Sequence, residues 1–310
     1  MTKDTRIPTA LPSKAFKRFV EGYQDHVIEW VHPVGKTIDP SLGQTFHSLR
    51  ERFQAVTDVG LSPVTKGLIR PENGLLPAHA DQPDLRYTFA GDGTTQSVLF
   101  IHGSPGQASD WSHFLSVTPE SQTRIAVDRP GFGGSDPHRP YRQLSDQAAA
   151  IARLIAERNR PTVLVGSSFG GPVALRLAAD HPDLVNGVVL VGAAADPALE
   201  KVHILQRIAH TPWVKRLLPQ HLIHSNTELL TLREELDLLG ERMEHIEAPV
   251  SILQGLHDTL VPPENATYLM KRLTGTKKRR VIMVENAGHF LHILTPQVVE
   301  NTLDDILNDV

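Results

Sequence analysis

Cysteine is absent from the 310-residue sequence, which excludes disulfide bonds and catalysis by a thiol. Long hydrophobic runs are absent too. No segment approaches the roughly 18 apolar residues that span a bilayer, and the N-terminus lacks the apolar core of a signal peptide. We therefore expect a cytoplasmic, soluble protein with no stable membrane insertion.

The sequence also has no large excess of charge of either sign, since its formal net charge is −4. No block of five or more basic residues occurs. The densest basic run, residues 277–280, directly precedes a strand-like segment and is interpreted as a solvated loop. Nucleic acid is therefore not an expected partner.

Hydrophobic residues make up 40% of the chain and charged residues 21%, proportions typical of a globular protein. From about residue 85, short β-rich runs alternate with helical patterns, and the later runs consist almost entirely of Val, Ile and Leu. Such strands are expected where helices cover both faces of a sheet, so the pattern predicts an α/β fold with a doubly wound, mostly parallel sheet. The predicted strands are Leu85–Phe89, Ser97–Ile101, Arg124–Val127, Thr162–Val165, Gly187–Val191, Val250–Leu253 and Val281–Val284, and the predicted helices are Ser145–Arg158, Pro172–Ala179, Pro263–Leu273 and Pro296–Leu307.

Residues 1–80 differ from the rest and are interpreted as an N-terminal helical extension. Apolar residues recur at helical spacing over residues 16–31 and again over 46–56, which predicts two amphipathic helices. We expect these helices to pack on the domain or on a second subunit, the latter giving a homo-oligomer. Binding to a membrane surface is the alternative, because three basic residues accompany the first apolar stripe.

Nearly sixty residues, 192–249, separate two of the predicted strands, far more than a crossover helix needs. Residues 196–247 are therefore predicted to form a helical cap over the carboxyl ends of the strands, where open α/β sheets bind ligands. The cap divides the core into a first part, residues 81–195, and a second part, residues 248–310. Trp213 in the cap is a candidate pocket residue.

The most informative motif is Gly-Ser-Ser-Phe-Gly at residues 166–170, between a predicted strand and a predicted helix. Ser168 has glycine two residues before it and two residues after it, where strand and helix backbones crowd together. Ser167 lacks both glycines and is the weaker candidate. A serine exposed at such a turn is suited to attack a carbonyl carbon.

A serine hydroxyl needs an adjacent general base, which is itself oriented by a third group. Asp258 follows one predicted strand and His289 follows the next, in the chain order nucleophile, acid, histidine. Asp196 competes with Asp258 as the orienting acid, and His292 competes with His289 as the base. No carboxylate or thiolate cluster accompanies the two histidines, so neither a metal nor a cofactor is expected.

Acyl transfer also needs hydrogen-bond donors for the developing oxyanion. The backbone N–H of Phe169, directly after Ser168 at a helix N-terminus, is one candidate. The loop His-Gly-Ser-Pro-Gly at residues 102–106 should supply the second. Pro105 has no N–H, so Ser104 is the expected donor.

With these residues assembled, the chain resembles the α/β-hydrolase family over roughly residues 80–310. The shared motifs are the 102–106 loop, Asp-Arg-Pro-Gly-Phe-Gly-Gly-Ser at 128–135, the 166–170 motif, the Asp258 loop and Gly-His-Phe at 288–290. The resemblance implies a triad of Ser168, Asp258 and His289, an oxyanion hole of Ser104 and Phe169, and a helical cap inserted between the sixth and seventh core strands. It also implies that residues 128–135 form a structural turn.

The expected reaction is hydrolysis of an ester with a small or medium apolar acyl group, through an acyl-enzyme on a small-molecule substrate. Trp111 is a candidate pocket residue, and a core position fits it equally well. Hydrolysis of a carbon–carbon bond, acyl transfer and cofactor-free perhydrolysis use the same triad. An aminopeptidase would need a carboxylate clamp, for which the cap offers Glu228, Glu234 and Glu235. A non-enzymatic ligand-binding protein of this fold would normally have lost a triad residue.

Overall fold

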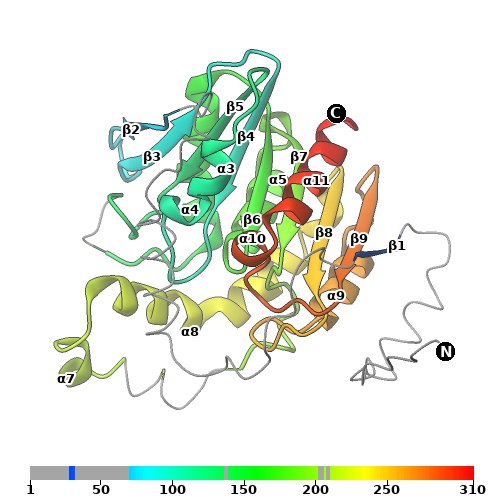
Figure 1. Ribbon diagram of the computed structural model, residues 1–310. Coiled ribbons are helices and arrows are strands. Elements are labelled where there is room, and N and C mark those ends of the chain that lie inside the picture. Colours follow the sequence, from blue (N-terminus) through cyan, green and yellow to red (C-terminus); the bar gives the residue numbers. More distant parts are fainter. Residues whose placement is uncertain (1–27, 32–69, 136–138, 202–205, 207–209) are drawn as a thin grey trace, which may run out of the picture.

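The computed structural model describes residues 28–31, 70–135, 139–201, 206 and 210–310. Within these ranges a nine-stranded sheet has the order β1-β9-β8-β7-β6-β4-β5-β3-β2 (Figure 1). All neighbouring strands are parallel except the pairs β2–β3 and β3–β5. The predicted doubly wound, mostly parallel sheet is confirmed. The strands are β1 (Ile28–Val31), β2 (Glu72–Leu76), β3 (Leu85–Ala90), β4 (Gln96–Ile101), β5 (Gln122–Val127), β6 (Thr162–Ser167), β7 (Val185–Val191), β8 (Val250–Gly255) and β9 (Arg279–Val284).

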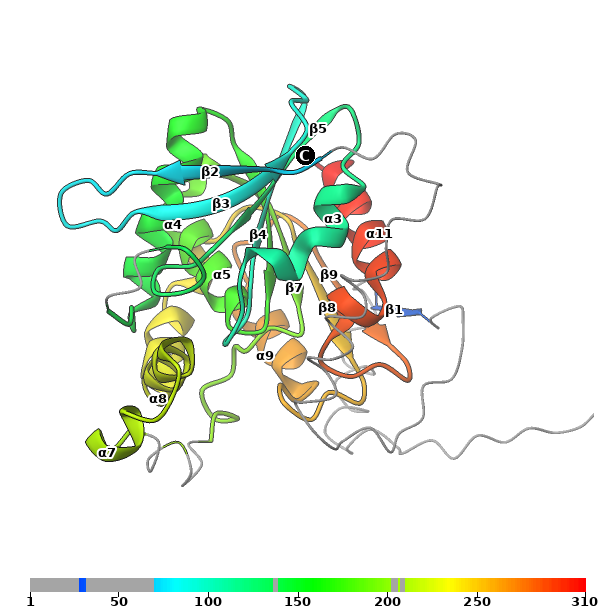
Figure 2. The ribbon, with the colours of Figure 1, turned by 60° about the vertical axis from the view of Figure 1, so that its left-hand side comes forward.

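Helices cover both faces of the sheet (Figure 2). Successive residues of the central strands enter two separate cores, so that Leu164 of β6 packs on one side and Val163 and Val165 pack on the other. Alternation of this kind explains why the strands are apolar throughout. The α-helices are α3 (Ser112–Ser116), α4 (Leu144–Arg158), α5 (Gly170–Asp180), α7 (Pro212–Lys215), α8 (Gln220–Gly240), α9 (Glu264–Arg272), α10 (Leu291–Leu294) and α11 (Pro296–Leu307). Within the described ranges, none of the helices has both the length and the apolarity to cross a membrane.

Two expectations for the N-terminal part need correction. Residues 28–31, predicted to end an amphipathic helix, form strand β1, which pairs in parallel with β9. Without β1, β9 would leave its backbone groups unpaired at the sheet edge, and this pairing outweighs a short helical pattern. The sheet also begins before residue 81, because β2 pairs with β3. The remaining residues of the two predicted helices lie outside the described ranges.

The insertion between β7 and β8 contains the long helix α8 and the short helix α7. Residues 202–205 and 207–209 of the predicted cap lie outside the described ranges. Helix α8 contacts the loops that follow β4 and β5, because the Ser104 hydroxyl donates a hydrogen bond to Ser225 and the His224 ring donates one to the carbonyl of Gly131. These contacts set α8 against the carboxyl edge of the sheet.

A buried ion pair ties one helical layer to the sheet. The guanidinium of Arg124, in β5, donates to both carboxylate oxygens of Glu300, in α11, at 2.7 and 2.8 Å. The side chains are only 1% and 12% exposed. The bidentate geometry satisfies charges that could not otherwise be buried.

Glu300→Ala leaves the buried guanidinium without its carboxylate, and we expect it to lower the free energy of unfolding by about 3–5 kcal/mol. Lys278→Ala breaks an ion pair with Asp309 whose lysine side chain is 48% exposed, and should cost less than about 1 kcal/mol. Urea unfolding at neutral pH measures both. Equal losses for the two variants would contradict this role for Glu300.

Candidate active site

Ser168 lies at the turn between β6 and α5 and is partly exposed. Its φ is +53°, a left-handed conformation that costs energy for a residue with a side chain and is found where the surrounding structure enforces it. The Ser168 amide donates to the carbonyl of Val191 in β7 at 3.0 Å, and the Ser168 carbonyl accepts from Gly171 at 3.0 Å. The strained turn expected for a nucleophilic serine is therefore present.

His289 and Asp258 lie together in the loops after β9 and β8. His289 Nδ1 is 2.8 Å from Asp258 Oδ2, and the two side chains are 9% and 0% exposed. The amides of Leu260 and Val261 donate to the other carboxylate oxygen at 3.0 and 2.8 Å. The carboxylate can accept a hydrogen bond from the Nδ1–H of the imidazole, which fixes the tautomer and leaves Nε2 able to accept a proton.

Gly192 connects this pair to the serine turn. It directly follows Val191, the residue that accepts the Ser168 amide proton. A Cβ at Gly192 would lie 3.2 Å from Asp258 Oδ2 and 3.4 Å from His289 Nδ1. Ser168 and His289 do not form a hydrogen bond with each other in the structure, and catalytic hydrogen bonds often tighten only when substrate binds. The complete triad stays a prediction.

Asp196 has a different role from the one considered for it. Its carboxylate accepts a hydrogen bond from the amide of Ala198 at 2.9 Å, and its own amide donates to the side chain of Asn265 at 2.9 Å. These contacts stabilise a local turn. Asp258, and not Asp196, is the carboxylate that contacts His289.

The loop after β4 lies against the serine turn. A Cβ at Gly103 would be 3.0 Å from Ser168 Cβ and 3.6 Å from Ser168 Oγ. Ser104 follows Gly103, and its hydroxyl donates to Ser225 Oγ in α8 at 2.8 Å. Among the described residues, the backbone amides of Ser104 and Phe169 have no acceptor. Both amides are therefore available to an oxyanion, although their roles remain predictions.

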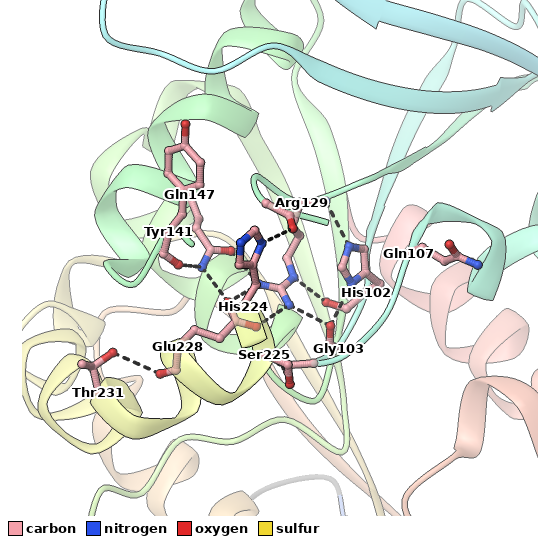
Figure 3. A network of polar contacts seen from close by, with 12 residues as sticks. His102, Gly103, Gln107, Arg129, Tyr141, Gln147, His224, Ser225, Glu228 and Thr231 are labelled. Atoms are coloured by element: carbon pink, nitrogen blue, oxygen red, sulfur yellow. Dashed lines mark hydrogen bonds and ion pairs between the residues drawn. The ribbon is translucent and has the colours of Figure 1, made fainter. Parts of the chain in front are cut away.

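Arg129, which follows β5, lies at the centre of a network of polar contacts beside the site (Figure 3). The sequence pattern alone did not predict this role. Its side chain is fully buried, and its guanidinium donates to the carbonyls of His102 and Gly103 and to both carboxylate oxygens of Glu228. Residues 128–135 were expected to form only a structural turn. A usable signal was Glu228 itself, because it shares helical spacing with the buried Leu232 and Leu236, and a charge on a buried face needs a partner.

His102 is a neutral side chain in this network. Its Nδ1 lies 2.8 Å from the carbonyl of Gly103, and its Nε2 accepts the backbone N–H of Arg129 at 3.0 Å. Burial, followed by the nearby Arg129 charge, lowers the pKa of His102 well below its usual value. The hydrogen bonds therefore fix one neutral tautomer, with its proton on Nδ1.

The acidic residues considered for an aminopeptidase clamp do not form one. Glu228 is paired with Arg129 and is 1% exposed. Glu235 accepts the backbone N–H of Leu144, at the start of α4, at 2.8 Å. Both carboxylates are thus occupied within the fold, while Glu234 lies exposed on the other side of α8. The aminopeptidase hypothesis loses its structural basis.

The two tryptophans proposed for a pocket lie in contrasting places. Trp111 is fully buried among core residues and contacts Phe100, Phe114 and His292, with ring centroids 5.0, 5.3 and 4.8 Å away. It belongs to the core, which is one of the two positions that its sequence context fitted equally well, and it is not a pocket residue in this structure. Trp213, in α7, is 78% exposed. Its assignment remains a prediction.

His292 is buried beside the serine turn. Its Nδ1 is 3.3 Å from Ser167 Oγ, and its ring stacks on Trp111. Burial, followed by the nearby His289, lowers the pKa of His292 to about 3. The side chain is therefore neutral near pH 7, and His289, not His292, is the histidine that contacts Asp258.

Comparison with known proteins matches residues 98–302 to the model of the alpha/beta hydrolase family. The chain belongs to this family. A pimeloyl-[acyl-carrier protein] methyl ester esterase of Neisseria meningitidis is 31% identical over 231 residues, which cover 63% of this chain and 86% of that protein. A monoacylglycerol lipase, abhd6-B, of Xenopus laevis is 25% identical over 72% of this chain and 79% of its own length.

Among solved structures, the 2-hydroxy-6-oxo-6-phenylhexa-2,4-dienoate hydrolase of Rhodococcus sp. strain RHA1 has the same fold. It superimposes with a TM-score of 0.61 at 17% identity, covering 77% of this chain and 99% of that one. The chain is therefore a hydrolytic enzyme. The two sequence relatives given above are an esterase and a lipase.

His292→Gln should make the stability of this hydrolase less sensitive to acid. Between about pH 3 and 6.5, His292 binds a proton in the unfolded state but not in the folded state, where it is buried. The free energy of unfolding therefore falls as the pH is lowered through this range. Removing the group should reduce the slope of unfolding free energy against pH by up to about 1.4 kcal/mol per pH unit.

Urea unfolding from pH 7 to pH 4 measures this slope, and His102 contributes equally to both proteins. An unchanged slope in His292→Gln would show that the imidazole is free to take up a proton in the folded state.

Proposed function

We propose that the enzyme hydrolyses carboxylic esters with a small or medium apolar acyl group, through an acyl-enzyme on Ser168. The observation that carries the proposal is the 2.8 Å contact between Asp258 and His289, together with the left-handed turn at Ser168. The ester-hydrolysing relatives support the same bond type. A small-molecule substrate satisfies these requirements without a cofactor.

The first half of the reaction transfers the acyl group to the enzyme. Ser168 Oγ attacks the carbonyl carbon while His289 Nε2 takes its proton, and Asp258 stabilises the imidazolium. The tetrahedral oxyanion accepts hydrogen bonds from the amides of Ser104 and Phe169. The carbon–oxygen bond then breaks, the alcohol leaves with the proton from His289, and the acyl group remains on Ser168.

The second half repeats these steps with water. His289 takes a proton from the water molecule as its oxygen attacks the acyl carbon, and the same two amides hold the oxyanion. Breakdown of the second tetrahedral intermediate returns the proton to Ser168 Oγ and releases the carboxylic acid. The enzyme ends in its starting protonation state.

Ser168→Ala should reduce kcat for hydrolysis of p-nitrophenyl butyrate by at least about 10³-fold, because no other hydroxyl replaces the attacking oxygen. Ser167→Ala is the matched control, since it removes the neighbouring hydroxyl and leaves the nucleophile in place. A fluorophosphonate should label the parent and Ser167→Ala, and should not label Ser168→Ala, as measured by intact mass.

Labelling or substantial turnover by Ser168→Ala would assign the nucleophile elsewhere. A folded parent that neither hydrolyses a panel of esters of increasing acyl length nor reacts with the probe would overturn the proposal and favour a ligand-binding role.

A further inference from the structure

We propose that Arg129 and Glu228 are positioning residues that couple cap helix α8 to the oxyanion loop, defined as residues 102–104. The proposal rests on the ester hydrolysis described above and adds two residues that act through the Ser104 amide. Both side chains are buried, at 0% and 1% exposure. They come from the turn after β5 and from α8, 99 residues apart in sequence.

The guanidinium of Arg129 uses all five of its hydrogens. Two go to Glu228 at 2.9 Å each, one goes to the side chain of Gln147 at 2.6 Å, and two go to the carbonyls of His102 and Gly103 at 3.0 and 2.7 Å. A planar guanidinium with every donor engaged has one orientation. Its position is therefore fixed jointly by the cap helix and by the loop.

The bond to Gly103 reaches the proposed oxyanion donor through one peptide plane. The carbonyl of Gly103 and the N–H of Ser104 belong to the same rigid, planar peptide group. Holding the carbonyl oxygen from one side fixes the direction in which the N–H points on the other. A charged donor on that carbonyl also polarises the peptide and strengthens its N–H as a donor.

Arg129 also contacts the second proposed oxyanion residue. Its guanidinium carbon lies 4.6 Å from the centre of the Phe169 ring and 4.7 Å from that of Phe132. Stacking of this kind favours a planar cation between aromatic faces. One side chain thus contacts the Gly103 carbonyl, which shares a peptide group with the Ser104 amide, and the ring of Phe169.

Helix α8 holds the loop at a second point. Ser225, three residues before Glu228 and on the same side of the helix, accepts a hydrogen bond from the Ser104 hydroxyl at 2.8 Å. Ser225 therefore holds the Ser104 side chain, and Arg129 holds the Gly103 carbonyl. Both contacts depend on the position of α8. Displacing α8 would release the orientation of the Ser104 amide.

The test separates this role from a purely structural one by replacing both charges together. R129M/E228L removes the ion pair without leaving an unpaired charge, a change that is often neutral for stability. For the folded double variant we expect kcat for p-nitrophenyl butyrate to fall at least 10-fold with KM changed less than 3-fold, because donors to an oxyanion act in the transition state.

The matched control is R124M/E300L, which removes the other buried bidentate pair, on the opposite face of the sheet. It should leave kcat within about 2-fold of the parent. A second variant, R129K, keeps the charge and loses the planar fork, so it should also lower kcat at least 10-fold with KM nearly constant, even if the double variant fails to fold.

Fluorophosphonate labelling supplies a readout that does not depend on the ester chosen. The labelling rate of R129K and R129M/E228L should fall with kcat, because the phosphoryl oxygen gains negative charge in the oxyanion hole as the serine attacks. If folded R129K or R129M/E228L keeps the parent's kcat and labelling rate, the positioning role is wrong while ester hydrolysis stands. A parent that is labelled but hydrolyses no ester refutes the ester assignment alone, and the labelling rates still test Arg129.

Discussion

No side chain fits at Gly166 or Gly170, and this crowding determines the geometry of the whole site. A Cβ at Gly170 would overlap the carbonyl oxygen of Ile101 in β4, and a Cβ at Gly166 would overlap the carbonyl oxygen of Gly170. Strand, turn and helix therefore meet backbone to backbone, and Ser168 is held in a left-handed conformation between them. Because the neighbouring strands are parallel, the loops carrying Asp258 and His289 follow their strands at the same edge of the sheet.

Two buried ion pairs stabilise this arrangement at different levels. The Arg124–Glu300 pair joins β5 to α11 and holds a helical layer on the sheet, whereas the Arg129–Glu228 pair joins the end of the same strand to α8. The second pair constrains the protonation of its surroundings. A proton on both nitrogens of His102 would place a second cation against Arg129 and remove the acceptor for the Arg129 amide. The neutral imidazole is thus part of the loop's geometry.

Local patterns in the sequence were sufficient to predict strands β3 to β9, helices α4, α5, α9 and α11, and the placement of Asp258 beside His289. The strands β6 to β9 are apolar enough to be recognised individually, and each candidate residue follows its strand by a short loop. Strand β2 escaped prediction because its sequence, Glu-Asn-Gly-Leu-Leu, lacks an alternating apolar pattern and is mostly exposed. The sequence left the position of Trp111 ambiguous, because the same local sequence pattern surrounds an aromatic residue that lines a pocket and one that fills a core. Arg129 and Glu228 are far apart in the chain, so only the folded arrangement brings their charges together.

The position of α8 has a consequence for how the cap and the catalytic loop are related. If the cap only covered a site, its amino-acid sequence could vary on every face as long as the packing was kept. Helix α8 instead presents His224, Ser225 and Glu228 to the loops at the carboxyl edge of the sheet, and Glu235 to the start of α4. Polar groups buried on that face all have partners in the core, and losing any one partner would leave a desolvated group unpaired. The inner face of α8 is therefore tied to the loops at the carboxyl edge of the sheet and is constrained by more than packing.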